Sequence, residues 1–406
     1  MRQGAGRRRG RQAGAVFVVT MGLLMAIGCN EGSSNPAEAQ APADSAVTFR
    51  VTVPEGTPDT ASVWISGNHP ALGDWSGRGL RARRLAGGAY EARQVFAPGS
   101  SLEFKVTRGG WETVEKAGDG SEMPNRRHLV DPPDTLDLVV ANWRDWVKDD
   151  RRESTLTGDI RLHRGIASRF LTPVRDVIVY LPPGYASESD RRYPVLYMHD
   201  GQNIFDAATS FVGEWRVDET AEDLIGQGAI EPLIVVGVYN TADRISEYTP
   251  AVDAGRGGNA DNYGRFLVDE LKPFIDSTYR TLPDREHSGV AGSSLGGLVS
   301  MHFALTLSET FSRIGVVSPS VWWADQHILG EVRGSSKPAS RIWLDMGTGE
   351  GAEAVAGARA LRDALVAKGW VLGGDLAYVE APGAAHNEAA WAQRVSPILR
   401  FLFPAP

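Results

Sequence analysis

From about residue 174 to the C-terminus, short apolar runs alternate with longer segments of helical periodicity. Each run has the length and composition of a buried β-strand. Apolar runs of this kind are typical of parallel strands with both faces covered by helices, so the alternation predicts an α/β fold built on a mostly parallel sheet. The runs are Val177–Leu181, Val195–Met198, Leu233–Val238, Ile314–Val317, Ile342–Met346 and Leu376–Val379.

The chain before this region has a different pattern. From Val47 to about Ala141, short alternating runs such as Leu102–Val106 are separated by clusters of Gly, Pro and Asp. This pattern predicts a small all-β sandwich. The charged stretch Arg144–Arg152 is the expected boundary, which gives a sandwich over 46–145 and an α/β domain over 155–406. A length of 406 residues agrees with two or three domains.

The N-terminus has the features of an export signal. Five arginines precede an apolar run, Ala13–Gly28, that is short for a membrane span, and Cys29 follows it directly. Ala26-Ile27-Gly28-Cys29 resembles the lipobox of bacterial lipoproteins, which implies acylation of Cys29. The alternatives are an ordinary signal peptide with a chance cysteine, or a twin-arginine signal. Residues 30–45 resemble a disordered tether, so we expect an exported protein, either secreted or held on the cell envelope by a lipid anchor.

Charge and cysteine content exclude several classes. The net charge is −8, and the clustered positive charge lies mostly in the first eleven residues, which argues against a nucleic-acid partner. The single cysteine excludes an internal disulfide and a cysteine-based metal cage. The sequence has no pair of histidines at metal-ligand spacing, no P-loop and no dinucleotide fingerprint, so it predicts neither a metal nor a cofactor.

One short motif indicates chemistry. Gly292-Ser293-Ser294-Leu295-Gly296 has the G-x-S-x-G form, in which a serine occupies a tight turn between a strand and a helix. The surroundings fit, because Gly289-Val290-Ala291 reads as the end of a buried strand and Leu295–Leu307 as a helix with small residues on one face. The helix N-terminus, with its unpaired N–H groups, would face the serine.

A serine hydroxyl becomes a good nucleophile only when a base removes its proton. After Ser294, the histidines are His302, His327 and His386. His302 lies eight residues into the expected helix and would point away from the turn. His386 follows the last strand-like run, in a loop that opens the C-terminal helix, so we expect His386 to be the base.

The base in turn needs an acid that fixes its tautomer. Glu350 lies in the loop after the strand-like run that ends near Met346, whereas Asp345 is expected within that strand. We favour Glu350 and keep Asp345 as the alternative.

Five segments within roughly residues 155–403 together resemble the esterase-D and enterochelin-esterase-like branch of the α/β-hydrolases. The resemblance implies that Ser294 is the nucleophile, His386 the base and Glu350 the acid, with the Leu295 and Gln202 N–H groups as oxyanion donors. The segments that carry it are Val177–Tyr185, His199–Asp206, Gly292–Gly296, Gly347–Glu350 and His386–Trp391.

Three further polar residues follow the strand-like run that ends at Val238. Arg244, Glu247 and Tyr248 are expected at the same sheet edge as the motif serine. They either line the acyl or alcohol pocket or form a solvated ion pair.

The sandwich region resembles a starch-binding module of the family-20 type. The resemblance rests on Val63–Gly67, Leu72–Trp75, Leu102–Val106 and Gly110–Glu112. It implies that Trp75 and Trp111 stack on the rings of an α-glucan, since pyranose C–H faces pack well on indoles. The alternative is that one or both are core residues of a sandwich that has lost its ligand.

Three function classes remain. The first is a secreted serine esterase that acts on an ester of, or near, a carbohydrate, such as an acetyl, feruloyl or siderophore-type ester. The second is an acyltransferase that uses the same serine. The third is a non-catalytic glycan-binding lipoprotein.

Overall fold

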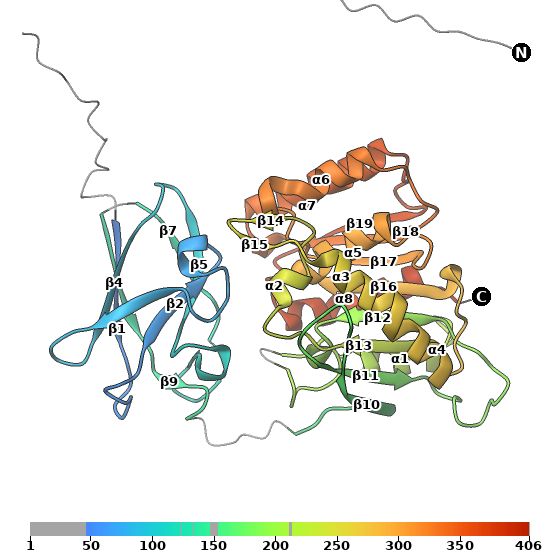
Figure 1. The fold of residues 1–406 in the computed structure, drawn as a ribbon, viewed down its shortest axis with the longest axis horizontal. Coiled ribbons are helices and arrows are strands. Elements are labelled where there is room, and N and C mark those ends of the chain that lie inside the picture. Colours follow the sequence, from blue (N-terminus) through green and yellow to red (C-terminus); the bar gives the residue numbers. More distant parts are fainter. Residues whose placement is uncertain (1–45, 122, 132, 147–152, 211–212, 406) are drawn as a thin grey trace, which may run out of the picture.

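The computed structural model describes residues 46–121, 123–131, 133–146, 153–210 and 213–405. The proposed signal, Cys29 and the tether over 30–45 lie outside the described residues. Figure 1 shows a strand-rich N-terminal part beside a larger part in which helices cover a central sheet. We call the first part the sandwich and the second the catalytic domain, because the candidate residues Ser294, Glu350 and His386 lie in the second part.

The sandwich is built on one strongly curved sheet with the strand order β7-β5-β2-β3-β4-β1-β8. Phe49 on β1 contacts Phe104 on β5 edge to face, with ring centroids 5.4 Å apart, although three strands separate β1 from β5 in the sheet. The sheet therefore folds over, and its two halves enclose one apolar core. The strands are β1 (Ala46–Thr52), β2 (Val63–Gly67), β3 (Leu80–Arg84), β4 (Tyr90–Val95), β5 (Ser101–Thr107), β7 (Arg126–Leu129) and β8 (Asp134–Val139), with the small pair β6 (Glu115–Lys116) and β9 (Asn142–Trp143) beside them.

The catalytic domain contains an eight-stranded sheet in the order β10-β11-β13-β12-β16-β17-β18-β19. The strands from β13 to the β19 edge are parallel, and β10 and β11 pair antiparallel at the other edge. The predicted α/β-hydrolase fold class is confirmed. The strands are β10 (Asp159–Ile166), β11 (Arg175–Leu181), β12 (Val195–His199), β13 (Ile234–Val238), β16 (Ser288–Ser293), β17 (Arg313–Val317), β18 (Arg341–Gly347) and β19 (Leu376–Ala381).

Helices cover both faces of this sheet because successive strand residues point to opposite sides. Val290 of β16, for example, joins the core under α3 to α7, whereas Ala291 joins the core under α1 and α8. Among the described residues, no helix combines the length and the apolar character that a membrane crossing needs. The helices are α1 (Val217–Gly226), α2 (Arg244–Glu247), α3 (Ala260–Arg265), α4 (Lys272–Thr278), α5 (Leu295–Thr306), α6 (Trp323–Gly334), α7 (Ala352–Ala367) and α8 (Glu388–Leu402), with a π-helical segment, Phe266–Leu271, between α3 and α4.

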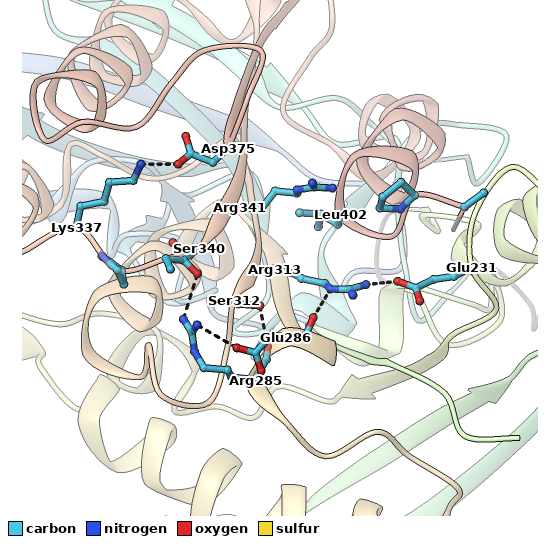
Figure 2. Close-up of a pocket in the computed structure, with 14 residues that line it drawn as sticks. Glu231, Arg285, Glu286, Ser312, Arg313, Lys337, Ser340, Arg341, Asp375 and Leu402 are labelled. Carbon is cyan, nitrogen blue, oxygen red and sulfur yellow. Dashed lines mark hydrogen bonds and ion pairs between the residues drawn. The ribbon is translucent and has the colours of Figure 1, made fainter.

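A cavity of about 910 Å³ lies where β17 and β18 begin. Figure 2 shows that charged side chains line it, and most of them are paired: Arg313 with Glu231, and Lys337 with Asp375. Ligands of parallel sheets bind at the carboxyl ends of the strands, which is the opposite edge. The candidate site therefore has to be sought there.

Candidate active site

Ser294 occupies a strained turn between β16 and α5. Its backbone has φ +59° and ψ −123°, a conformation that L-residues rarely adopt. The Ser294 N–H donates to the carbonyl of Val317 at 3.0 Å, which ties the turn to the neighbouring strand. A Cβ at Gly292 would lie 2.8 Å from the His199 ring and 3.1 Å from Gly296 Cα, so the first glycine of the motif is needed for close packing. The motif thus presents the serine at the carboxyl edge of the sheet.

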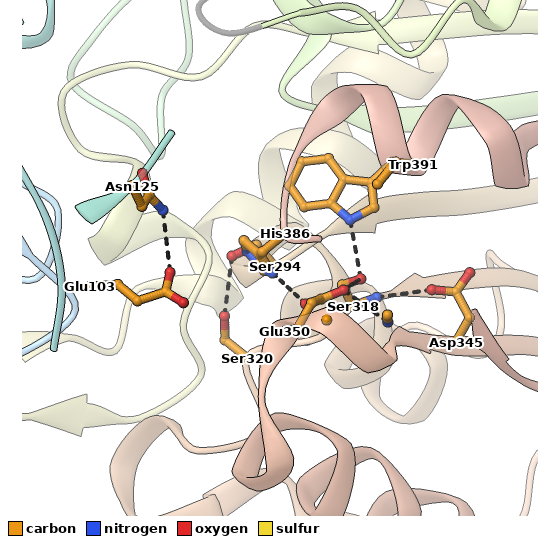
Figure 3. Close-up of polar contacts among 12 residues, drawn as sticks. Glu103, Asn125, Ser294, Ser318, Ser320, Asp345, Glu350, His386 and Trp391 are labelled. Carbon is orange, nitrogen blue, oxygen red and sulfur yellow. Dashed lines mark hydrogen bonds and ion pairs between the residues drawn. The ribbon is translucent and has the colours of Figure 1, made fainter. Parts of the chain in front are cut away.

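His386 and Glu350 form a tight pair at the same edge. His386 Nδ1 lies 2.6 Å from Glu350 Oε2 (Figure 3). The Glu350 side chain is 3% exposed, and its other oxygen accepts hydrogen bonds from Ser318 Oγ at 2.6 Å and the Gly347 N–H at 2.9 Å. Burial alone would raise the pKa of Glu350, but the hydrogen bonds, above all the one with His386, outweigh it and lower the pKa below its usual value. The carboxylate is therefore ionised. Because it bonds to Nδ1, Nε2 of the imidazole remains available to a reacting partner.

A serine-rich loop after β17 links this pair to Ser294. Ser318 contacts Glu350, and two residues later the Ser320 N–H donates to the Ser294 carbonyl at 3.1 Å. Ser320 Oγ also lies 3.3 Å from Ser294 Oγ (Figure 3). In the described part of the chain, the Ser294 hydroxyl is hydrogen-bonded to Ser320 and not to His386. Catalytic hydrogen bonds are often long or poorly aligned until a substrate binds, so this arrangement is compatible with His386 as the base.

The alternative acid, Asp345, lies within β18 and is fully buried. Its carboxylate accepts from Arg394 Nη1 at 2.6 Å and from Trp343 Nε1 at 2.7 Å. Burial raises the pKa of Asp345 to about 6. The Asp345 carboxylate is thus occupied by Arg394 and Trp343, whereas His386 bonds to Glu350. The geometry therefore favours Glu350 as the acid.

The two expected oxyanion donors come from separate elements. Leu295 is the first residue of α5, where helical N–H groups have no partner within the helix. Gln202 lies in a 3₁₀ turn, Gly201–Asn203, directly after β12. The Gln202 side chain accepts from the Asn240 N–H at 3.2 Å, and its carbonyl accepts from Thr209 Oγ1 at 2.7 Å. The turn is therefore held rigidly.

Arg244 anchors the start of this turn. Its guanidinium makes two hydrogen bonds to Asp200, at 2.7 and 2.8 Å, and Asp200 has φ +58° at the start of the turn. Glu247, by contrast, pairs with Arg175 in the interior at 2.7 and 2.8 Å, and Tyr248 is fully buried. Both interpretations of Glu247 and Tyr248, pocket lining and solvated ion pair, are wrong, because these residues belong to the core.

Several residues that support His386 and the oxyanion turn were given no role from the sequence. On α8, Trp391 packs edge to face on the His386 ring with centroids 5.0 Å apart, and Arg394 lies one turn further along. Their spacing of three residues on a helix predicts a shared face, and this was the available signal. Asn203 of the oxyanion turn donates to Glu388 at 3.2 Å, which joins the histidine loop to that turn. Burial raises the pKa of Glu388 to about 7.

The two predicted carbohydrate-stacking residues lie together on the sandwich. The rings of Trp75 and Trp111 have centroids 6.0 Å apart and an interplanar angle of 34°. Trp111 Nε1 donates to the Trp75 carbonyl at 3.1 Å. Both indoles are half-buried, so neither is a fully buried core residue.

A family model described as "Putative esterase" matches residues 168–402, more than half of the chain. The endo-1,4-beta-xylanase/feruloyl esterase of Xylanibacter ruminicola is 28% identical over 233 residues, which cover 55% of this chain and 29% of that protein. The ferri-bacillibactin esterase BesA of Bacillus subtilis is 30% identical over 155 residues, which cover 34% of this chain and 51% of that protein. The chain thus spans about half or less of the length of these two relatives.

Among solved structures, the BES protein from Bacillus cereus superposes with a TM-score of 0.51 at 25% identity, covering 61% of this chain and 96% of that one. A further relative, an alpha-amylase of Niallia circulans, is 34% identical over 107 residues, which cover 26% of this chain and 8% of that protein. The amylase match agrees with a starch-binding-like N-terminal region.

Proposed function

Because this chain belongs to the esterase family that the matching model describes and is a carboxylic-ester hydrolase, we propose that it cleaves its substrate through an acyl-enzyme on Ser294. The observation that carries the proposal is the partly buried hydrogen bond between Glu350 and His386, at the sheet edge where the strained turn presents Ser294. A nucleophile, a base and an acid in this order along the chain are the parts that ester hydrolysis needs.

In the first half of the reaction, Ser294 Oγ attacks the ester carbonyl and His386 Nε2 accepts its proton. Glu350 keeps the proton of the imidazole on Nδ1 and stabilises the positive charge that forms. The Leu295 and Gln202 N–H groups bind the oxygen that becomes negative. His386 then donates the proton to the leaving alcohol, which leaves an acyl group on Ser294.

In the second half, His386 accepts a proton from water, and the hydroxide attacks the acyl carbonyl. The bond to Ser294 breaks, its oxygen recovers the proton from His386, and the carboxylic acid is released. A small alcohol that replaced water in this step would make the protein an acyltransferase.

Active-site labelling tests the proposal directly. A fluorophosphonate should label wild-type protein at Ser294 with one equivalent and abolish hydrolysis of 4-nitrophenyl acetate. The matched control is Ser320→Ala, which removes the neighbouring hydroxyl but should still be labelled. Full hydrolytic activity in Ser294→Ala would refute the proposal.

For the substrate, we propose a carboxylic ester of, or near, a carbohydrate. Support comes from the feruloyl esterase among the relatives and from the similarity of the sandwich to starch-binding modules.

For the location, we propose an exported protein anchored through Cys29, on the basis of the lipobox-like segment.

A further inference from the structure

Polar contacts between described residues join the sandwich to the catalytic domain. Asp74 Oδ2 lies 2.7 Å from Arg256 Nη1, and the Asp74 side chain is 11% exposed. Arg256 belongs to the hairpin of β14 (Val252–Asp253) and β15 (Arg256–Gly257), which extends toward the sandwich in Figure 1. The second contact runs from Arg127 Nη1 on β7 to the carbonyl of Gly349 at 3.2 Å.

The second contact reaches the candidate active site. Gly349 directly precedes Glu350, so Arg127 touches the short turn that carries the acid of the proposed triad. Glu103 of β5 pairs with Arg127 at 3.0 Å and also accepts from Asn125 at 3.3 Å. In the view of Figure 3, Glu103 and Asn125 lie on the opposite side of Ser294 from Asp345. The sandwich thus borders the site with groups that can donate and accept hydrogen bonds.

The loop that carries Trp75 is linked through Gly67 to the strand of Glu103. The Trp75 N–H donates to the Gly67 carbonyl at 2.8 Å, and Gly67 pairs across strands with Phe104, the neighbour of Glu103. Trp75 also directly follows Asp74, the residue that contacts Arg256. The loop that carries Trp75 is therefore joined both to the strand of Glu103 and to the contact with the catalytic domain.

The loop that presents Trp75 is strained. Asp74 has φ +43° and Trp75 φ +61°, two successive non-glycine residues in the left-handed region. Such a conformation costs free energy and persists where the surrounding contacts enforce it, often at functional sites. Here it directs Asp74 to the catalytic domain and Trp75 onto Trp111.

We propose that the sandwich and the catalytic domain bind the same substrate molecule, a carbohydrate that carries the ester. Its sugar rings pack on Trp75 and Trp111, its hydroxyls hydrogen-bond to Arg127 and Glu103, and its ester carbonyl lies at Ser294. The Arg127 side chain is 53% exposed and has donors to spare beyond Glu103 and Gly349. This inference rests on the proposed esterase function and adds that the sandwich is part of the substrate site, rather than a separate anchor to polysaccharide.

The test compares three acetyl esters on the full mature chain: 4-nitrophenyl acetate, mono-acetylated maltotriose and mono-acetylated xylotriose. Trp75→Ala, Trp111→Ala and Arg127→Ala should each lower kcat/KM on the better trisaccharide ester about tenfold, roughly the effect of one stacking or hydrogen-bonding contact. On 4-nitrophenyl acetate Trp75→Ala and Trp111→Ala should keep wild-type kcat/KM, whereas Arg127→Ala, which also loses the contact with Gly349, should lose less on this ester than on the trisaccharide ester. Trp75→Phe, which retains a flat apolar ring, should recover most of the loss.

Arg50→Ala is the matched control for Arg127→Ala. Like Arg127, Arg50 is an arginine of the sandwich that is about half exposed (56%) and pairs with a glutamate on the neighbouring strand. Its partner is Glu91 on β4. It should leave both substrates unaffected.

Three outcomes would overturn the inference. One is an equal loss on both substrates, which indicates a structural role. Another is that the Trp75 and Trp111 variants hydrolyse the trisaccharide ester like the wild type but no longer bind insoluble starch, which indicates a separate anchor. The third is a wild-type enzyme that cleaves 4-nitrophenyl acetate but neither trisaccharide ester. Failure to cleave 4-nitrophenyl acetate as well would instead count against the proposed function.

Discussion

Glu350 reaches His386 from a turn at the end of β18, and the hydrogen bond between Glu350 Oε2 and His386 Nδ1 is 2.6 Å long. The acid is buried while the imidazole is 35% exposed, so the pair has one protected end and one end open to a substrate. The second oxygen of Glu350 is held by Ser318 and by the Gly347 N–H. The orientation of the imidazole therefore depends on the loops that follow three strands, β17, β18 and β19.

The first prediction concerns Ser294 and His386. Ser294→Ala and His386→Ala should each lower kcat on 4-nitrophenyl acetate by several orders of magnitude. The double variant should cost little more, because the two residues act as a unit. Steady-state kinetics with circular dichroism as the folding control measures this. Additive losses would contradict a shared role in one step.

The second prediction separates the two candidate acids. Glu350→Gln should lower kcat severely, because a neutral amide neither stabilises the imidazolium nor enforces the tautomer. Asp345→Asn should affect kcat far less, since Asp345 contacts Arg394 and Trp343 rather than His386. The kcat values of both variants at pH 8 give the answer. The reverse ranking would show that Glu350 is not the acid.

The third prediction concerns the ion pair behind the site. Arg394 and Asp345 are 6% and 0% exposed, and removal of one partner leaves a buried charge uncompensated. Arg394→Met should lower the free energy of unfolding by about 3–5 kcal/mol at pH 8. The double variant Arg394→Met, Asp345→Asn should recover part of that loss. Urea unfolding of the four proteins measures the coupling, and a double variant that loses the sum of both effects would contradict it.

The fourth prediction is a pH dependence of stability. Burial, reinforced by Asp200, raises the pKa of Glu388 to about 7, against the opposing effects of His386 and Arg244. A group whose folded pKa is raised binds its proton more tightly when folded, so the wild type loses stability as pH rises from about 4.5 to 7. Glu388→Gln keeps an oxygen that Asn203 can donate to and removes this slope.

Thermal unfolding of Glu388→Gln against wild type from pH 5 to pH 8 tests this. The variant should gain relative stability as pH rises, and the gain should level off above pH 7. The matched control, Glu353→Gln on the exposed start of α7, should show no such trend. A constant difference between Glu388→Gln and wild type across the range would contradict a titration of Glu388.

The fifth prediction concerns the N-terminus. If Cys29 is acylated, a fatty-acid label supplied to the cells should appear on the protein and be lost in Cys29→Ser, which should move to the soluble fraction. A lipoprotein anchor with more than one chain should hold the protein stably on a membrane. An unlabelled mature protein that begins at another residue would count against the anchor.

The sequence by itself was sufficient to predict the main strands and to single out Ser294 and His386 as candidates. Each predicted run of the parallel sheet overlaps an observed strand, because a strand buried on both faces must be apolar along its whole length. The strand β10 was missed since it lies at the sheet edge, where exposed polar residues such as Arg161 and Arg164 mask the pattern. Ser294 and His386 were identifiable because each follows a recognisable strand and opens a helix.

Tertiary structure decided which polar residues meet. Local spacing could not separate Glu350 from Asp345, because the choice depends on whether a carboxylate at the end of β18 points to the loop after β19 or back to α8. It also decided that Glu247 pairs with Arg175, a residue 72 positions away, instead of facing a pocket. The contacts of Arg127 and Asp74 with the catalytic domain span 222 and 182 positions. Periodicity and motifs report on neighbours along the chain, whereas the folded packing alone determines partners at such separations.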